Sequence, residues 1–213
     1  MHPLPVCQAP PYWRQATAEL ARRDTVLGPI IARYPGEALR PHGDIFYSLA
    51  RAVVGQQISV AAAERIWSRL VDRVGTVVPE TIAAAGADDL SACGLTRRKA
   101  ACLATIAEAM PGDDDRWRIW LELDDDRLNT ALMDLPGVGP WTCHMILIFA
   151  AGRADVLPIA DIGLRRAVDE VYGMTAGRSG ARDLEALAER WRPWRSVATW
   201  YLWRLLDPVP VAY

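Results

Sequence analysis

The sequence Leu135-Pro136-Gly137-Val138-Gly139-Pro140-Trp141-Thr142 separates two stretches whose apolar residues recur with helical spacing, 128–135 before it and 141–150 after it. Glycine adopts backbone angles that other residues avoid, so Gly137 and Gly139 predict a tight turn. Pro140 suits the first turn of a helix, where the missing N–H of proline costs nothing. The segment therefore predicts two helices joined by a glycine hairpin, which we define as residues 135–142.

The helix that follows the glycine hairpin is predicted to begin with an anion-binding terminus. Backbone N–H groups point out of the start of a helix and, together with the helix dipole, bind phosphate. A plain turn between two helices is the alternative for this sequence. The two glycines, with Thr142 at the helix start, favour phosphate binding.

Helical periodicity dominates the rest of the chain, and alternating strand patterns are scarce. Ser59 is predicted to cap one of these helices. Clusters of glycine and proline predict breaks at 35–36, 75–79, 86–89, 111–115, 152–158 and 173–180. We therefore predict an all-α fold with these apolar helix faces: Val60, Ala63, Ile66, Trp67, Leu70, Val71 and Val74; Ala100, Leu103, Ala104 and Ala107; Leu184, Leu187, Ala188 and Trp191; Val197, Trp200, Tyr201 and Leu205.

Length and composition indicate a packed globular protein. The chain has 213 residues, 51% of them hydrophobic, which is enough for a core in one domain or in two closely packed lobes. The net charge of −2 argues weakly against a nucleic-acid-binding protein, but phosphate contacts need only a local basic patch. The best local cluster is Arg97-Arg98-Lys99, a candidate phosphate contact or the solvated start of a helix. Lys99 is the only lysine in the chain.

Neither a membrane span nor a cofactor is predicted. Apolar runs such as 145–151 are too short to cross a bilayer, and the first residues lack the pattern of a signal peptide. We therefore expect a cytoplasmic protein, associated with the nucleoid if the source is bacterial, and we expect a monomer. The cysteines fit no zinc or iron–sulfur spacing, and we expect them to be reduced and mostly buried: Cys7, Cys93, Cys102 and Cys143.

Three parts of the chain resemble motifs of the HhH-GPD base-excision DNA glycosylases, and they occur in the same order as in that family. The resemblance is to the AlkA-type 3-methyladenine DNA glycosylase II branch in particular. The resemblance implies two helical lobes: one of roughly residues 52–150, which contains the hairpin 135–142, and one of roughly residues 12–51 plus 155–213. It also implies a cleft between the lobes that receives a base flipped out of double-stranded DNA. The matching parts are 53–63, the glycine hairpin with 155–168, and 193–196 with Trp203 beyond it.

Asp161, nineteen residues after Thr142, matches the catalytic aspartate of the family. Breaking an N-glycosidic bond builds positive charge on the sugar, which a nearby carboxylate stabilises. The same group can orient or deprotonate the attacking water. An alkylated purine already carries positive charge and leaves readily, so no dedicated acid is needed. The alternative is that Asp161 only caps the helix that follows it.

The resemblance also implies a base pocket that includes Trp141, Met145 and Trp203. Bifunctional relatives carry at the position of Trp141 a lysine that forms a Schiff base, so tryptophan there implies a monofunctional enzyme. Trp203 would stack on a cationic base. Met145 stands where the AlkA-type pattern has an aromatic residue, so the pocket shape should differ. The alternative for these aromatic side chains is core packing.

DNA contacts are implied for the hairpin residues Gly137, Val138, Gly139 and Thr142 and for a second segment, Gln56-Gln57-Ile58-Ser59. In the family the second segment approaches the minor groove, and Gln57 matches the residue that fills the gap left by the flipped base. A polar turn capped by Ser59 is the alternative for that segment.

The hairpin carbonyls also match a family site for a monovalent cation, Na⁺ or K⁺, whose ligands would be those of Met133, Leu135 and Val138. Some relatives carry an iron–sulfur cluster on four cysteines after the last helix. This chain has no cysteine after Cys143, so that cluster is not expected.

The sequence therefore predicts a monofunctional glycosylase that excises 3-methyl- and 7-methylpurines from duplex DNA without a cofactor, with the lesion spectrum beyond them left open. Two alternatives remain. One is a non-catalytic helix-hairpin-helix DNA-binding protein. The other is a glycosylase/lyase for oxidised or mismatched bases, against which Trp141 and the missing cysteine cluster count.

Overall fold

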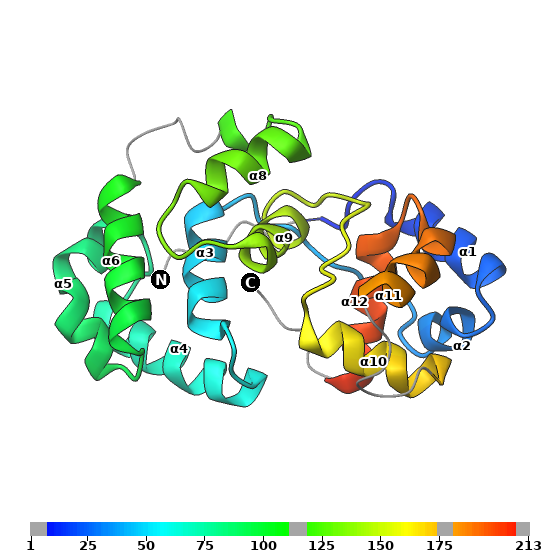
Figure 1. The fold of residues 1–213 in the computed structure, drawn as a ribbon, viewed down its shortest axis with the longest axis horizontal. Coiled ribbons are helices and arrows are strands. Elements are labelled where there is room, and N and C mark those ends of the chain that lie inside the picture. The colour runs from blue at the N-terminus through cyan, green and yellow to red at the C-terminus, as the bar shows by residue number, and fades with distance from the viewer. Residues whose placement is uncertain (1–7, 111–118, 174–180, 208–213) are drawn as a thin grey trace. The chain divides into compact units, whose positions relative to one another are not determined.

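A computed structural model describes residues 8–110, 119–173 and 181–207. These residues form helices and no strand, which confirms the predicted all-α class (Figure 1). The chain divides into two compact units. Of the described residues, the first unit holds 42–110 and 119–151, and the second unit holds 8–41, 152–173 and 181–207.

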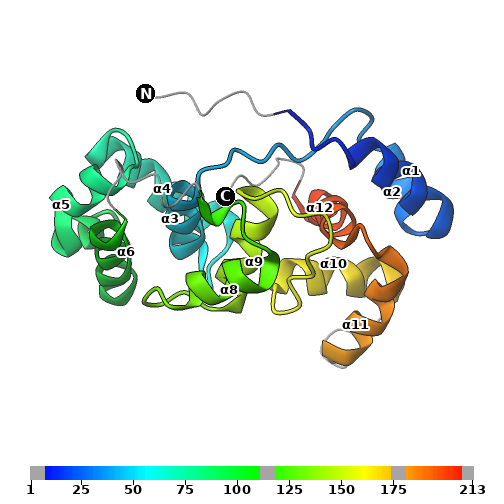
Figure 2. The same ribbon diagram turned by 90° about the horizontal axis from the view of Figure 1, so that it is seen from above.

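The first unit is built around helix α3, which is buried along its whole length. Helix α3 packs against α4, α6 and α9, and α8 packs against α9. Helices α5 and α6 lie side by side (Figure 2). The bounds are α3 (Ile45–Gly55), α4 (Val60–Val74), α5 (Pro79–Ala92), α6 (Arg97–Ala109), α8 (Asp125–Met133) and α9 (Pro140–Phe149).

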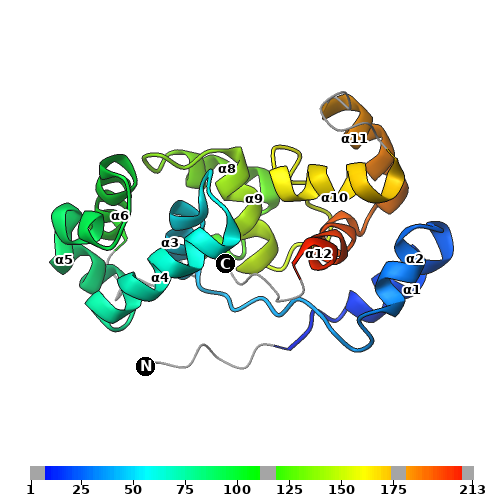
Figure 3. The ribbon, with the colours of Figure 1, turned by 90° about the horizontal axis from the view of Figure 1, so that it is seen from below.

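The second unit is built around helix α12, which packs against α1, α2 and α10. Figure 3 shows α10 beside α12. The buried Asp24 carboxylate accepts hydrogen bonds from the Tyr172 hydroxyl at 2.8 Å and the Trp191 indole at 3.0 Å. These bonds join the end of α10 and the short helix η1 to the residues just before α2. The bounds are α1 (Trp13–Arg23), α2 (Leu27–Ala32), α10 (Ile162–Tyr172), α11 (Ala181–Ala188), η1 (Glu189–Trp191) and α12 (Arg195–Leu206).

The predicted helix over 60–74 is confirmed, but its apolar face is narrower than predicted. Ser59 caps α4 by accepting a hydrogen bond from the Ala62 N–H at 3.3 Å. Only Trp67 and Leu70 of the predicted face are buried, while Val60 is 37% exposed. Helix α4 packs mainly on α3 and α5, and it buries one edge of the apolar stripe.

The remaining predicted faces bury well. All four residues are buried in the α6 face and in the face shared by α11 and η1. In α12 three of the four predicted residues are buried, and Leu205 is half-buried. These faces form because residues three and four apart lie on the same side of a helix.

The break predicted at 86–89 appears as a kink inside α5. Gly86 has φ +69° and ψ 171°, which interrupts the helix without ending it. The predicted break at 111–115 and most of the one at 173–180 lie outside the described residues.

The thiols are free wherever the structure describes them. Cys93 and Cys143 are buried, as predicted, and Cys102 is half-buried. Burial raises the pKa of the Cys143 thiol to about 11, so it stays protonated at neutral pH. Cys7 lies outside the described residues. None of the helices in the described ranges is long and apolar enough to cross a membrane.

Candidate DNA interface and active site

The predicted helix-hairpin-helix is confirmed in the first unit. Helix α8 ends at Met133, and α9 begins at Pro140 in the first helical position. Gly137 has φ +70°, a left-handed conformation that favours glycine. Gly139 is the N-cap of α9 and supplies no capping side chain, so the helix start presents backbone alone.

The glycine hairpin lies directly on α6. A Cβ atom on Gly137 would stand 2.7 Å from the Cys102 sulfur, so this position has no room for a side chain. The Cys102 thiol donates a hydrogen bond to the Pro136 carbonyl at 2.9 Å. Burial raises the pKa of Cys102, which keeps the thiol in the protonated form that can donate. Gly137 is therefore required twice, for its backbone angle and for its close approach to α6.

Gln56 joins the loop between α3 and α4 to the glycine hairpin. Its side-chain amide donates to the Thr142 hydroxyl at 3.1 Å and to the Gly137 carbonyl at 3.3 Å. Thr142 is only 1% exposed. Its hydroxyl is turned inward and accepts from Gln56, so a contact of Thr142 with DNA, which stays a prediction, would come through its backbone.

The loop of residues 56–59, which we call the 56–59 loop, carries the predicted gap-filling residue. Gln57 has φ +57°, the only positive φ of a non-glycine residue in the described part of the chain. Gln57, Ile58 and Ser59 are exposed, and Ile58 keeps 39% of its surface exposed. The alternative of a polar turn capped by Ser59 describes the local geometry correctly, but it does not explain a strained glutamine beside an exposed isoleucine.

Lys99 is half-buried, and its side chain is turned toward α3. Its ammonium donates to the carbonyls of Val54 at 2.9 Å and Gln56 at 2.7 Å, at the end of α3. Burial lowers the pKa of Lys99, and the two carbonyls offset part of that cost. Arg97 and Arg98 are exposed. Arg97 and Arg98 therefore lie where either predicted role of the cluster, a phosphate contact or a solvated helix start, requires them.

The remaining predicted site residues of the first unit, in α9 and just before it, differ in how deeply they are buried. Trp141 is half-buried. Met145 exposes none of its surface, because α9 is apolar on nearly all sides and buries its central residues. Met145 contributes to the packing of α9 in this structure, and its place in a base pocket stays a prediction. Val138 is 9% exposed, so any contact with DNA would come through its backbone.

The predicted cation ligands lie around the hairpin turn. The Leu135 carbonyl accepts a hydrogen bond from the Val138 N–H at 3.3 Å, and Met133 is 49% exposed. The site on the Met133, Leu135 and Val138 carbonyls stays a prediction. Side chains offer no alternative metal centre in the described ranges, where no three His, Cys, Asp or Glu residues gather.

Asp161 in the second unit caps helix α10. Its Oδ1 atom accepts hydrogen bonds from the Leu164 N–H at 2.6 Å and from the Trp203 indole N–H at 2.9 Å. A Cβ on Gly163 would lie 3.1 Å from this oxygen, which is a tight contact, and 3.5 Å from the nearest indole atom of Trp203, which is an ordinary van der Waals distance. The glycine therefore leaves room for the carboxylate oxygen. Trp203 is half-buried, whereas Trp200 and Tyr201 are buried.

The contact between Trp203 and Asp161 was missed at the level of sequence. The spacing of 42 residues carries no signal for it. The cap was foreseen as an alternative to catalysis, but the structure makes the two compatible, since one oxygen holds both donors and thereby fixes the orientation of the whole carboxylate.

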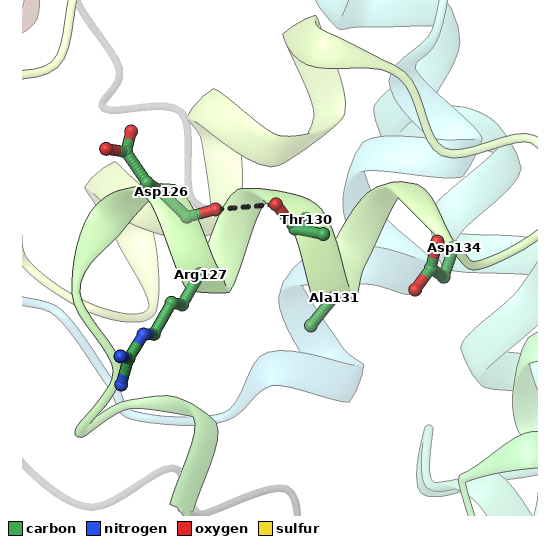
Figure 4. Close-up of a pocket in the computed structure, with 5 residues that line it drawn as sticks. All are labelled: Asp126, Arg127, Thr130, Ala131 and Asp134. Carbon is green, nitrogen blue, oxygen red and sulfur yellow. Dashed lines mark hydrogen bonds between the residues drawn. The ribbon is translucent and has the colours of Figure 1, made fainter.

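A shallow hollow of about 370 Å³ lies on the outer face of α8 (Figure 4). It is lined by Asp126, Arg127, Thr130, Ala131 and Asp134. Thr130 donates to the Asp126 carbonyl at 2.9 Å, which is a bond within the helix itself. The hollow contains none of the predicted site residues, and we assign it no role.

Comparison with known proteins identifies the family. The model of the family described as "HhH-GPD superfamily base excision DNA repair protein" matches residues 50–193. The chain is 25% identical over 200 residues to "Alkylbase DNA glycosidase-like protein mag2" of Schizosaccharomyces pombe, covering 91% of this chain and 93% of that protein. It is 31% identical over 167 residues to "DNA-3-methyladenine glycosylase 1" of the same organism, covering 75% of this chain and 71% of that protein.

A further relative is much longer than this chain. The "Probable bifunctional transcriptional activator/DNA repair enzyme AlkA" of Mycobacterium tuberculosis is 31% identical over 201 residues, which cover 91% of this chain and 40% of that protein. Among solved structures, a 3-methyladenine DNA glycosylase from Archaeoglobus fulgidus matches with a TM-score of 0.76 and 25% identity, covering 93% of this chain and 77% of that one. The S. pombe Mag1 structure in complex with abasic DNA has the same fold, with a TM-score of 0.77 and 24% identity over 93% of this chain and all of that one.

The two hairpin glycines should respond differently to alanine. Gly137→Ala should destabilise the protein by about 1–2 kcal/mol from the left-handed backbone alone, and by more because of the contact with Cys102. Gly139→Ala should leave stability nearly unchanged, because its backbone is extended and no atom lies within 4 Å of the new Cβ. Urea unfolding measures both, and equal stability of the two variants would show that Gly137 is not under this constraint.

Proposed function

The chain belongs to the HhH-GPD superfamily of base excision DNA repair proteins, and we propose that it is a monofunctional DNA glycosylase that excises alkylated bases from duplex DNA. The family match over residues 50–193, together with relatives named as 3-methyladenine DNA glycosylases, carries this proposal. The substrates it favours are 3-methyl- and 7-methylpurines. We propose that it acts as a monomer on the DNA of the cytoplasm or nucleoid.

In the first unit, the glycine hairpin and the 56–59 loop are the proposed DNA-binding elements. The uncapped start of α9 offers backbone N–H groups to phosphate, without a side chain at Gly139 to keep DNA away. The loop offers Gln57 and Ile58 to the minor groove. Binding through phosphates would be sensitive to salt and largely independent of sequence.

In the second unit, Asp161 is the proposed catalytic residue. The glycosidic C–N bond breaks with its electron pair going to the departing base, and the sugar becomes positively charged. The carboxylate stabilises that charge and orients a water, which adds to the sugar carbon and loses a proton. The products are the free base and an abasic site. The N–H groups of Leu164 and Trp203 support this role by holding Oδ1 before any substrate binds.

The structure supports a role for Trp203 that differs from simple stacking. Its indole N–H is engaged with Asp161, so the ring is tied to the proposed catalytic group. A cationic methylpurine can still interact with the face of that ring. Trp203 would then position the carboxylate and contact the base at once.

The direct test of the function is base release from defined duplexes. Duplexes that contain 3-methyladenine, 7-methylguanine, hypoxanthine or 8-oxoguanine are incubated with the protein, and free base is measured. Release of the methylpurines supports the proposal. Binding of all duplexes without release would favour a non-catalytic DNA-binding protein, and release with spontaneous strand cleavage would favour a glycosylase/lyase.

Asp161→Asn should fold normally and lose activity. The amide oxygen can still accept from Leu164 and Trp203, and asparagine is as good an N-cap as aspartate. The charge is lost, and the rate of base release should fall on the order of 10²–10³-fold. Single-turnover base release is measured beside lesion-duplex affinity, which should be kept. Near-normal release would leave Asp161 with the role of a cap only.

Trp203→Phe should slow base release while leaving lesion binding almost unchanged. Phenylalanine keeps an aromatic face but cannot donate to Asp161, and a hydrogen bond to a charged group is worth enough to cost roughly tenfold in rate. Trp203→Ala removes the face as well, so it should also weaken binding of cationic lesions. If Phe substitutes fully for Trp in single-turnover assays, the ring acts by stacking alone.

The protein should not form a covalent adduct with DNA. A lyase needs an amine that attacks the sugar, and the sole lysine side chain of the chain is engaged with the carbonyls of Val54 and Gln56. Treatment of a reaction mixture with borohydride should therefore trap nothing, while a bifunctional glycosylase run in parallel is trapped. A trapped adduct that persists in Lys99→Met would point to the N-terminal amine.

A further inference from the structure

The 56–59 loop is held in a conformation that its own sequence does not favour. Helix α3 ends at Gly55, and Gln57, two residues on, has φ +57°. Helices commonly end with a left-handed residue at this place, but that residue is usually glycine. A longer side chain in this region of backbone angles persists only where neighbouring contacts hold it.

Besides a turn hydrogen bond from the Ile58 N–H to the Gly55 carbonyl at 3.4 Å, contacts from α6 hold this loop. The Lys99 ammonium reaches from the first turn of α6 to the Val54 carbonyl in the last turn of α3 and to the Gln56 carbonyl. The Gln56 carbonyl belongs to the peptide group between Gln56 and Gln57. Lys99 therefore holds the backbone directly before the left-handed residue Gln57. A cation at the C-terminal end of a helix is also stabilised by the helix dipole.

The same loop is connected to the glycine hairpin through Gln56. The backbone carbonyl of this residue accepts from Lys99, while its side chain donates to Thr142 and Gly137. A further hydrogen bond, from Cys102 to Pro136, fixes the hairpin to α6. The two elements proposed to contact DNA thus share one anchor, the first two turns of α6.

We propose that Lys99 is a positioning residue for base flipping, which couples the 56–59 loop to the glycine hairpin so that Gln57 is held ready to enter the duplex. This inference rests on the proposed function. The hairpin fixes the phosphate backbone, and Gln57 must replace a stacked base at a set distance from it. If the loop changed conformation on contact with the stacked bases, Gln57 would not displace the target base from the stack.

The opposing explanation is that Lys99 is one more positive charge near DNA. Arg98 provides a matched control, because it is its neighbour in the same helix and is exposed. Lys99→Met keeps most of the aliphatic stem and removes the two hydrogen bonds with the charge. Arg98→Met removes the same charge one residue away, without a contact to α3.

The experiment compares wild type, Lys99→Met, Lys99→Arg and Arg98→Met in three measurements. The first is affinity for an undamaged duplex, and the second is single-turnover release of 7-methylguanine. The third is the fluorescence of 2-aminopurine placed beside the lesion, which rises when the stack opens. Circular dichroism and thermal unfolding check that each variant is folded.

With Lys99→Met we expect undamaged-duplex affinity to change little, while base release falls by about tenfold or more and the fluorescence rise is lost. Lys99→Arg, which keeps donors and charge, should recover part of the release rate. Arg98→Met should lower affinity for damaged and undamaged duplexes by the same factor. A merely structural role for Lys99 would not separate the fluorescence rise from duplex affinity in this way.

Lys99→Met that releases base and opens the stack like wild type overturns the proposal, as does a Lys99→Met that loses affinity for both duplexes equally, like Arg98→Met. If Lys99→Met does not fold, Thr142→Val takes its place, because it removes the closer of the two acceptors of the Gln56 amide at nearly constant volume. Thr142→Val with wild-type stack opening would then overturn the coupling. Absence of base release by the wild type is a different result, since it rejects the proposed function itself.

Discussion

The close approach of the glycine hairpin to α6 is the constraint on which the first unit's candidate DNA surface depends. Gly137 has no room for a side chain beside Cys102, and Pro136 is held by the Cys102 thiol. The hairpin therefore has one position relative to α6, and α6 also holds the end of α3 through Lys99. Two loops that are about 80 residues apart in the chain become one rigid surface for this reason.

The second unit shows how a helix cap and a reacting group can be the same side chain. A carboxylate has two oxygens and can accept several hydrogen bonds. In Asp161 one oxygen takes both the cap of α10 and the indole of Trp203, which fixes the plane of the group without removing its charge. The absence of a side chain at Gly163 is part of the same arrangement, because a Cβ there would crowd this oxygen at 3.1 Å.

Burial separates the residues that can act directly from those that act through others. Thr142 and Met145 were both predicted as site residues, and both are buried. Thr142 still matters, because it accepts from Gln56, whereas Met145 contributes to the packing of α9. Gln57, Ile58, Trp141 and Trp203 keep exposed surface, so their side chains are the ones for which substrate contact can be proposed.

Local sequence patterns are enough to predict the helices, the hairpin and the class of site. Periodicity placed the helices, the two glycines with Pro140 placed the hairpin, and the spacing to Asp161 indicated the catalytic candidate, because each of these signals depends on residues close in the chain. Tertiary structure alone decided what the side chains do. Lys99 turns inward to α3, Trp203 reaches Asp161, and Met145 is buried, since each outcome depends on which helix lies opposite. Local patterns carry no information about such partners, which explains why the hairpin was foreseen and its anchor was not.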